Sequence, residues 1–419
     1  MDKQIIAVMP LYLKGHSQGE YIFDHNWAQA FHNFGGNYYP KLQSSVPFTP
    51  VTGRRFLIKR GFEKEARDAL EKGIVNLAIT NNLSSAHVTF CTPIEAKEVS
   101  KNNFIKRKTL QYHWENKGFS NFEDFLNSLV SRKRKTIKKE RQIASSFFKE
   151  KGGIFCLTGS EIEEKHWDSF WEFYQDTGNR KWGYPYLTRD FFKIINKSMS
   201  DDILLILAIE NNIPIAGALN FIGKNTLFGR YWGCSKYQSC LHYELCYYQA
   251  IEYALKNNIR KVEAGAQGEH KISRGYLPSF VYSIHWFSNK TFSTAISDYL
   301  NQDPNFIIDE LKSLEELSPY KNLLSDTIRN KNILEENGVK KGINQIYKLN
   351  SKSGIKASKL FKAGIIGSRI RKIGLEDILS KEDVKQILEA TNSTILTSDS
   401  SIKPVSYTHL RAHETPEHL

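Results

Sequence analysis

Hydrophobic positions recur at strand and helix spacing over the first 118 residues. An apolar run at Gln4–Leu13 predicts a buried strand, and apolar positions three or four residues apart predict a helix over Glu63–Asn81. Ala86–Cys91 and the more loosely alternating Phe104–His113 predict two further strands. These elements indicate one α/β domain over residues 1–118. No helix precedes the first strand to cover it, so we expect this domain to be incomplete at its N-terminus.

A second set of elements follows between residues 119 and 320. Asn211–Asn212 and Gly223–Asn225 supply tight turns between three successive strands. The predicted order is helix, strand, two helices, three strands, helix and two strands, over Phe122–Lys149, Ile154–Leu157, Glu161–Asp176, Arg189–Met199, Ile203–Glu210, Ile213–Ile222, Thr226–Trp232, Leu241–Lys256, Lys261–Ala264 and Tyr282–Phe287. This order resembles that of the acetyltransferase (GNAT) fold. We therefore expect an α+β chain of two tandem GNAT-like domains, the first truncated at its N-terminus.

The last hundred residues differ in character from the rest. Residues 321–405 are rich in Lys, Ser, Asn and Ile, and we expect a helical or partly disordered extension with short helices such as Lys381–Ala390. Ser406–Leu419 has no hydrophobic period and carries three of the 12 His residues. It resembles translated vector sequence, so we expect a non-native tail that makes no contact with the folded domains.

Composition narrows the function classes. No stretch reaches the roughly 18 to 20 apolar residues of a membrane span, and Met1–Met9 is too short for a secretory signal. Five scattered cysteines favour a reducing compartment, and Cys234, Cys240 and Cys246 lack the spacing of a zinc site, so no metal is expected. A net charge of +13 favours anionic partners. We expect a cytoplasmic protein, at most peripheral at the inner membrane face, of open oligomeric state.

A basic helix is the first candidate for ligand binding. Ser131–Lys151 holds nine Lys or Arg against two Glu. A cationic helix face can bind phosphates or a polyanion, and the alternative is an ordinary solvated face. The candidate contacts are Arg132, Arg134 and Lys138.

Two further segments combine cations with aromatic residues. Gly178–Phe192 has the composition of a ligand-contact loop before a helix, unless its aromatic residues fill the core. Its candidate contacts are Arg180, Lys181, Trp182 and Tyr184. In Phe228–Cys234, Arg230 and Tyr231 are candidates because an Arg within so apolar a strand needs an anionic partner. That partner can be a ligand or a structural carboxylate.

The most informative segment is Glu263–Pro278. A strand delivers Glu263 to its C-terminal end, glycines follow, and Glu269 and Lys271 come soon after. Acyl transfer to an amine needs a base and a positive group or N–H donor for the oxyanion. We predict Glu263 or Glu269 as base and Lys271 as oxyanion stabiliser, against the alternative of an ordinary charged loop. Further candidate contacts in this loop and the preceding helix are His242, Glu244, His270, Arg274 and Tyr276.

One motif of coenzyme A enzymes is missing. GNAT enzymes usually place a Gln/Arg-x-x-Gly-x-Gly/Ala loop before the helix that follows the three strands, where backbone N–H groups bind the pyrophosphate. Here that loop, Cys234–Cys240, contains no glycine. The strand order therefore indicates an acyltransferase whose usual grip on coenzyme A is absent.

Residues from about Met9 to Pro319 resemble the FemAB-like family of peptidoglycan biosynthesis or recognition, within the acyl-CoA N-acyltransferase superfamily. The resemblance is carried by MPLYLKGHSQGEY, YYPKLQSSVPFTPVTG, SRKRKTIKKER, RKWGYPYLTRDFF, IAGALNFIG, GRYWGC, HYELCYYQAIEYA and VEAGAQGEHKISRGYLP. Fem enzymes use aminoacyl-tRNA as donor and a muropeptide precursor as acceptor, and they also lack the coenzyme A loop. Family members begin well before Gln4 and end near Pro319.

The resemblance implies a bacterial N-acyltransferase or aminoacyltransferase acting on an amine acceptor, with a peptidoglycan precursor as the candidate acceptor. The implied acyl donor is either aminoacyl-tRNA or acyl-CoA. Implied partners are an anionic substrate, either a muropeptide precursor or a nucleotide-linked donor, and tRNA. Two alternatives stay open: a coenzyme A-dependent small-molecule N-acyltransferase and a non-catalytic binder of cell-wall precursors.

Overall fold

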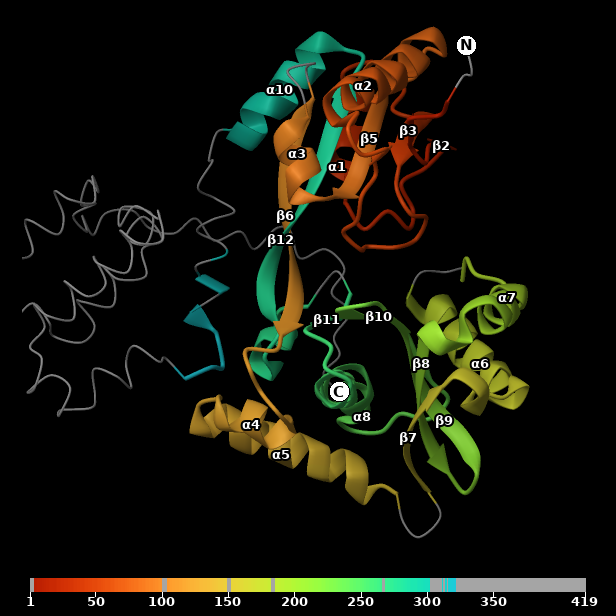
Figure 1. Cartoon of the computed structure of the whole chain (residues 1–419), viewed down its shortest axis with the longest axis vertical. Helices are drawn as coiled ribbons and strands as arrows, with labels where there is room; N and C mark the ends of the chain where they lie inside the picture. Colours follow the sequence, from red (N-terminus) through yellow and green to blue (C-terminus); the bar gives the residue numbers. More distant parts are fainter. Residues whose placement is uncertain are drawn as a thin grey trace, which may run out of the picture. The chain divides into compact units, whose positions relative to one another are not determined.

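The fold is built on a mixed sheet that joins two halves, seen in a computed structural model of the chain (Figure 1). The structure describes residues 4–99, 104–148, 152–181, 185–265, 268–301, 311, 313–314 and 316–321, with the side chains of 179–181 left out. The predictions for residues 322–419, including the extension and the tail, lie outside the described residues.

Residues 4–115 supply strands of two to eleven residues and three helices. Its elements are β1 (Ala7–Val8), β2 (Tyr12–Lys14), α1 (His25–Asn33), β3 (Lys41–Ser44), β4 (Leu57–Ile58), α2 (Glu63–Thr80), β5 (Ser85–Cys91), α3 (Pro93–Glu98) and β6 (Ile105–Glu115). The predicted helix α2 and the strands β5 and β6 are confirmed.

The single buried strand predicted over Gln4–Leu13 is wrong. These residues contribute to two separate short strands, β1 and β2. Ile5 is 77% exposed and Val8 is 48% exposed. Strand β1 pairs with β4 in a two-stranded sheet, whereas β2 is the first strand of the main sheet. Since an edge strand lacks a neighbour on one side, an apolar run there need not be buried.

Residues 122–301 supply most of the helices. Its elements are α4 (Phe122–Asn127), α5 (Ser131–Ser146), β7 (Gly152–Thr158), α6 (Glu164–Lys181), α7 (Arg189–Met199), β8 (Ile203–Glu210), β9 (Ile213–Ile222), β10 (Thr226–Cys234), α8 (Leu241–Tyr243), a π-helical turn (Glu244–Tyr248), α9 (Gln249–Lys256), β11 (Lys261–Glu263), a 3₁₀ turn (Glu269–Arg274), β12 (Leu277–Phe287) and α10 (Lys290–Asn301). The main sheet has the strand order β2-β3-β5-β12-β6-β11-β10-β9-β8-β7. The predicted α+β class is confirmed by this mixed sheet and its helices.

Helices cover both faces of the sheet in the second half. Alternate residues of β8 point to opposite faces. Leu204 and Ile206 pack with residues of α4, α5 and α9, whereas Leu205 and Leu207 pack with residues of α6 and α7. Because both faces are covered, the sequence of β8 is apolar from Ile203 to Ile209, and its boundaries could be predicted without a polar alternation.

The basic helix predicted over Phe122–Lys149 is divided in two. α4 ends at Asn127 and α5 begins at Ser131. Between them the Val130 N–H donates to the Pro319 carbonyl, and Leu129 forms a β-bridge with Tyr320. The backbone at the break is therefore bonded to a distant segment, which the local sequence pattern does not reveal.

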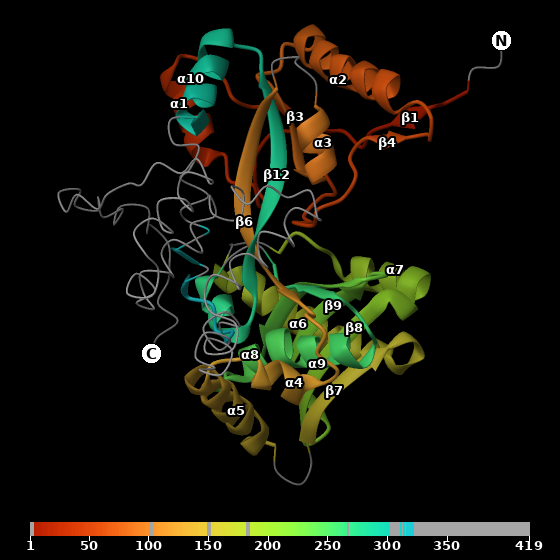
Figure 2. The same cartoon turned by 60° about the vertical axis from the view of Figure 1, so that its left-hand side comes forward.

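Strands β6 and β12 run through both halves, as Figures 1 and 2 show. Near its start β12 pairs with the end of β6, with Leu277 opposite His113, and near its end it pairs with β5, with Phe287 opposite Ser85. α10 then packs through Phe292 in one core cluster with Trp27 and Phe31 of α1. In space it therefore belongs to the first half of the molecule, with the elements of residues 4–115. The division into domains at residues 118 and 119 stays a prediction. Within the described ranges, no helix has the length and apolar character needed to span a bilayer.

Candidate functional site

Strands β10 and β11 diverge soon after they meet. They are parallel and pair over three residues each, ending with Phe228 opposite Glu263. β10 continues along β9 as far as Cys234, whereas β11 ends at Glu263. The polar groups at the end of β11 therefore lie where the sheet separates.

Strand β10 carries a β-bulge at the point of divergence. Gly229 lies opposite Asn220 and Tyr231 opposite Leu219, so Arg230 is the extra residue. A bulge re-aims the side chain it carries. The Arg230 guanidinium donates to the Phe48 carbonyl and, at 3.3 Å, to the Tyr231 hydroxyl.

Arg230 makes no ion pair with a carboxylate among the described residues. Its guanidinium lies 5.1 Å from the centre of the Tyr231 ring, and its acceptors are a neutral carbonyl and a hydroxyl. Of the two partners considered for this Arg, a structural carboxylate is therefore not provided by the described part of the chain. Arg230 remains a candidate for binding an anionic ligand.

Glu263 is a buried carboxylate at the end of β11. It is 5% exposed, and its Oε1 lies 2.5 Å from Lys261 Nζ and 3.9 Å from His113 Nε2. Burial raises the pKa of Glu263, and the Lys261 ammonium opposes that effect. Burial, together with Lys261 and Lys271, lowers the pKa of His113 to about 3, so this imidazole is neutral at neutral pH.

Lys271 is a buried ammonium group beside the same histidine. It is 4% exposed, and its Nζ donates to the Gly265 carbonyl at 3.3 Å. Gly265 and Gly268 have φ values of +80° and +113°, which favour glycine and let the chain turn back after β11. Burial lowers the pKa of Lys271 to about 8, so it is mostly charged at neutral pH and can still lose a proton.

The two predicted bases lie in different surroundings. Glu269 begins the 3₁₀ turn and is exposed, as is the neighbouring His270. His270 Nε2 lies 2.9 Å from the Tyr247 hydroxyl. Glu263 is thus buried near a neutral imidazole, whereas Glu269 faces solvent, and the role of either residue as base stays a prediction.

Arg274, the last residue of this turn, and Tyr276, just after it, pack in the interior. The Arg274 guanidinium lies 2.7 Å from Glu140 of α5 and 3.4 Å from the centre of the Tyr243 ring. Tyr276 is fully buried, and its hydroxyl donates to the Tyr247 carbonyl at 3.3 Å. These contacts give both residues a structural role, and contact with substrate stays a prediction for them.

Glu244 and His242 belong to the helical segment that follows β10. Arg141 of α5 lies 2.9 Å from Glu244 and 2.7 Å from Glu252. Burial raises the pKa of Glu244, and Arg141 opposes that effect. The His242 ring lies 5.1 Å from the Trp232 ring. The π-helical turn begins at Glu244, and such turns occur often at functional sites.

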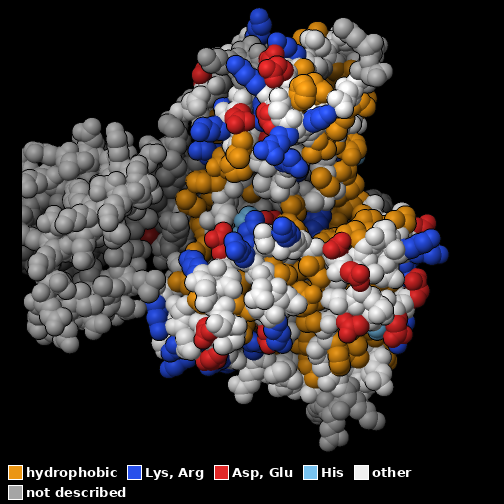
Figure 3. All heavy atoms as spheres, viewed as in Figure 1, with side chains coloured by type: hydrophobic (Ala, Val, Ile, Leu, Met, Phe, Trp, Pro, Cys, Tyr) orange, Lys and Arg blue, Asp and Glu red, His pale blue; other side chains and the backbone are white. Residues whose placement is uncertain are grey.

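The basic helix α5 is partly neutralised by its neighbours. Lys138 lies 2.8 Å from Glu123, and Arg134 donates to Asn127 at 3.4 Å. Arg132, Lys135 and Lys139 are not involved in any ion pair among the described residues, and their side chains are exposed. The visible face of the molecule shows basic and acidic side chains interspersed (Figure 3). The exposed cations of α5 remain available to an anionic partner.

The predicted contacts Arg180, Lys181, Trp182 and Tyr184 lie outside the residues whose side chains the structure describes. Tyr186, from the same segment, is described. Its ring stacks on Phe48 with 4.0 Å between ring centres, and its hydroxyl lies 2.8 Å from that of Tyr21 and 3.3 Å from that of Tyr231. Tyr21, Phe48 and His113 belong to no chemical motif, and Tyr186 and Glu263, which they approach, lie far away in the chain, so no local pattern predicts them.

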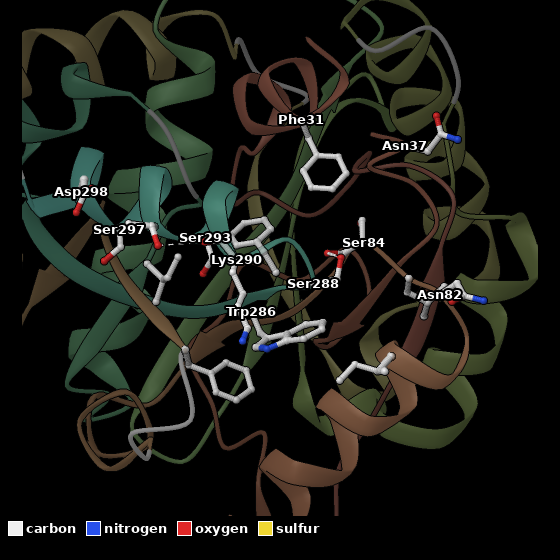
Figure 4. Close-up of a pocket in the computed structure, with 16 residues that line it drawn as sticks. Phe31, Asn37, Asn82, Ser84, Trp286, Ser288, Lys290, Ser293, Ser297 and Asp298 are labelled. Atoms are coloured by element: carbon white, nitrogen blue, oxygen red, sulfur yellow. Dashed lines mark hydrogen bonds between the residues drawn. The ribbon is translucent and has the colours of Figure 1, made fainter. Parts of the chain in front are cut away.

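A pocket of about 960 Å³ lies in the first half, away from these groups. Figure 4 shows aromatic residues such as Phe31 and Trp286 at this pocket, together with polar residues of α10 such as Ser293 and Ser297. Its lining includes none of the predicted site residues. Within the described ranges, no group of His, Cys, Asp and Glu is arranged to hold a metal ion.

Several solved structures share parts of this fold. L-PGS from Bacillus licheniformis matches at 8% identity with a TM-score of 0.43, over 61% of this chain and 81% of its own. FemX matches at 12% identity with a TM-score of 0.39, over 69% of this chain and 100% of its own. A tandem GNAT protein from the clavulanic acid biosynthesis pathway matches at 8% identity with a TM-score of 0.36, over 60% and 77%. At these identities the similarity concerns the fold alone.

The family assignment comes from the sequence as a whole. No curated protein matches this chain. One family model, described as peptidoglycan biosynthesis/recognition, matches residues 1–322 and so covers every residue that the structure describes. This match confirms the family predicted from the sequence motifs. The chain belongs to the FemAB-like family.

Proposed function

We propose that this protein transfers an acyl or aminoacyl group to a substrate amine where β10 and β11 diverge. The observation that carries the proposal is the pair formed by buried Glu263 and buried Lys271, on either side of the glycine turn after β11. Both lie in the electrostatic neighbourhood of His113. A peptidoglycan precursor is the proposed acceptor, in keeping with the family description.

The two groups suit the two needs of the reaction. The acceptor amine attacks the carbonyl carbon of the donor, and the carbonyl oxygen becomes negative. The Lys271 ammonium stabilises this oxyanion, and Glu263 accepts the proton released by the attacking nitrogen. When the carbonyl re-forms, the donor's ester C–O bond (or the thioester C–S bond of acyl-CoA) breaks, and the leaving oxygen or sulfur takes up that proton. Burial assists both roles, because a raised pKa makes a carboxylate a better base and a dry site strengthens the interaction between ammonium and oxyanion.

The donor is proposed to be an aminoacyl-tRNA, with acyl-CoA as the alternative. The loop before α8 has no glycine, and Cys240 at its end adopts a left-handed conformation with φ of 63°. The Leu241 N–H there already donates to the Gln238 carbonyl. Both observations disfavour the usual pyrophosphate cradle. Both donors are made in the cytoplasm, where we place the reaction, including the inner membrane face.

Substitution at the two groups tests the proposal. Lys271→Met removes the ammonium while keeping the side-chain length, and Glu263→Gln removes the base. Each should lower turnover by on the order of a hundred-fold or more. The donor and acceptor are first identified by mass spectrometry of copurified small molecules, followed by transfer of a radiolabelled acyl group. Glu269→Gln is the matched control and should keep most of the activity.

A binding protein without catalysis is the second candidate, since the family description includes recognition. Precursor binding that persists in Lys271→Met and Glu263→Gln, with no transfer by the parent protein from either donor, would support this candidate. Near-parental transfer rates in both variants would instead place the catalytic centre elsewhere.

A further inference from the structure

We propose that residues 46–53, in the connection between β3 and β4, form a gate that an oxyanion opens by displacing the Phe48 carbonyl from Arg230. The ligand class is a phosphate or carboxylate group. The gate lies beside the groups of the proposed function, but its movement does not require that any acyl group is transferred.

The ring of Phe48 holds this gate closed through contacts on both sides. One face stacks on Tyr186 of the second half, with 4.0 Å between ring centres and 11° between ring planes. Gly19 of the first half lies against the ring so closely that a Cβ on it would overlap the Phe48 side chain. Lys14 Nζ lies 5.8 Å from the ring centre. Phe48 is therefore held between the two halves of the molecule.

Three side chains from outside this loop donate hydrogen bonds to its carbonyls. Gln111 donates to the Pro50 carbonyl at 2.9 Å, and Arg55 donates to the Val51 carbonyl at 2.9 Å. Both donors are buried, whereas Arg230, which holds the Phe48 carbonyl, is only partly buried. The hydrogen bonds at Pro50 and Val51 thus come from donors that are shielded from solvent, whereas the hydrogen bond at Phe48 is more accessible to a ligand.

The closed position is conformationally unfavourable at two bulky residues. Phe48 has a φ of 54° and Tyr21 a φ of 57°. Large side chains rarely adopt this left-handed region, because the Cβ crowds the backbone. The surrounding contacts must therefore compensate, and removing one of them should release the loop.

An oxyanion can compete with the Phe48 carbonyl for Arg230. The guanidinium now donates to neutral oxygens only. A hydrogen bond to an ionised acceptor is about twice as strong as one to a neutral acceptor, and Arg can form two in parallel with phosphate or carboxylate. An anion that binds Arg230 would replace the Phe48 carbonyl as its acceptor, and the Phe48 end of the loop would lose this hydrogen bond.

The loop also lies beside the proposed catalytic groups. Gln111, which holds Pro50, has its Oε1 3.2 Å from His113 Nε2, and His113 neighbours Glu263. Arg230 lies on the bulge where β10 leaves β11. Opening at Phe48 would therefore admit an anionic substrate at the end of the sheet where Glu263 lies.

Hydrogen exchange of the loop tests the gate. We would measure exchange of the amides of residues 46–53 in the full chain, with sodium pyrophosphate, sodium succinate or sodium chloride at equal ionic strength. Either oxyanion should speed exchange near Phe48 by about tenfold relative to chloride. A response to pyrophosphate alone indicates a phosphate ligand, and a response to succinate alone indicates a carboxylate.

Two variants and a control complete the test. Arg230→Gln should exchange fast without any anion and show no further response. Gly19→Ala should also open the loop by pushing on Phe48. Gly35→Ala is the control, because Gly35 has a similar φ of +83° but no neighbour within 4 Å of an added Cβ; it should behave as the parent. Exchange that is unchanged by both anions, or unchanged in both Arg230→Gln and Gly19→Ala, would overturn the proposal.

Discussion

Replacing Lys271 with methionine should stabilise the fold at neutral pH, although the same change removes a proposed catalytic group. Burial lowers the pKa of Lys271 from 10.5 to about 8. This fall of 2.5 pH units corresponds to roughly 3.5 kcal/mol at ~1.4 kcal/mol per unit. Losing the hydrogen bond to the Gly265 carbonyl offsets about 1 kcal/mol. The net gain in the free energy of unfolding should be about 2.5 kcal/mol at pH 7.

The stability that Lys271→Met gains over the parent should be larger at low pH than at high pH. The pKa of Lys271 is lower in the folded chain than in the unfolded chain, so the unfolded state binds more protons between pH 8 and 10.5. The parent protein therefore becomes more stable as the pH rises through this window, whereas the methionine variant lacks this contribution. The advantage of Lys271→Met is complete below pH 8 and disappears by pH 10.5.

Urea denaturation at pH 7 and at a pH near 9.5 measures both effects. Lys256→Met serves as the control, because the Lys256 side chain is 72% exposed and its replacement should change stability by no more than about 0.5 kcal/mol. A Lys271→Met variant that is less stable than the parent at pH 7, or equally advantaged at both pH values, would refute the argument from burial.

Two further predictions concern other charged groups. Lys41 Nζ lies 2.5 Å from Asp24 and 2.9 Å from Glu20 in the interior, so Lys41→Met should cost about 3–5 kcal/mol of unfolding free energy by urea denaturation, and a cost below about 1 kcal/mol would contradict this. Reversing the charges of Arg132 and Lys135 should weaken tRNA binding in a filter assay and flatten its salt dependence; unchanged binding would show that α5 is only a solvated face.

The second half of the fold could be predicted well because its signals are local. Asn211 and Asn212 have φ values of 52° and 63°, as the tight turn between β8 and β9 requires. The strands on either side are buried on both faces, so their apolar runs mark their full length. By contrast, the apolar run at Gln4–Leu13 lies in short strands, one of them at the edge of the main sheet, and the sequence alone does not distinguish an edge from a centre.

The site was predictable only where its residues are close in sequence. Glu263 and Lys271 are eight positions apart and share one glycine-rich turn, so a local pattern could find both. The partner of Arg274 is Glu140, 134 residues earlier, and that of Glu244 is Arg141, 103 residues earlier. Such pairings depend on the tertiary fold. Without them, buried structural ion pairs and ligand contacts have the same appearance in a sequence.

The place of β12 in the sheet has a consequence for synthesis of the chain. Thr89 of β5 pairs with Ser283 of β12, almost two hundred residues later. At ~5–20 residues per second, a ribosome needs roughly 10–40 s to make the segment between them. During that time the backbone N–H and C=O groups of β5 and β6 that later pair with β12 have no partner in it. Exposed strand edges favour association with other chains. A nascent chain arrested before Leu277 should thus aggregate readily and be cleaved by proteases at β5. A chain extended beyond Phe287, which contains all of β12, should resist both.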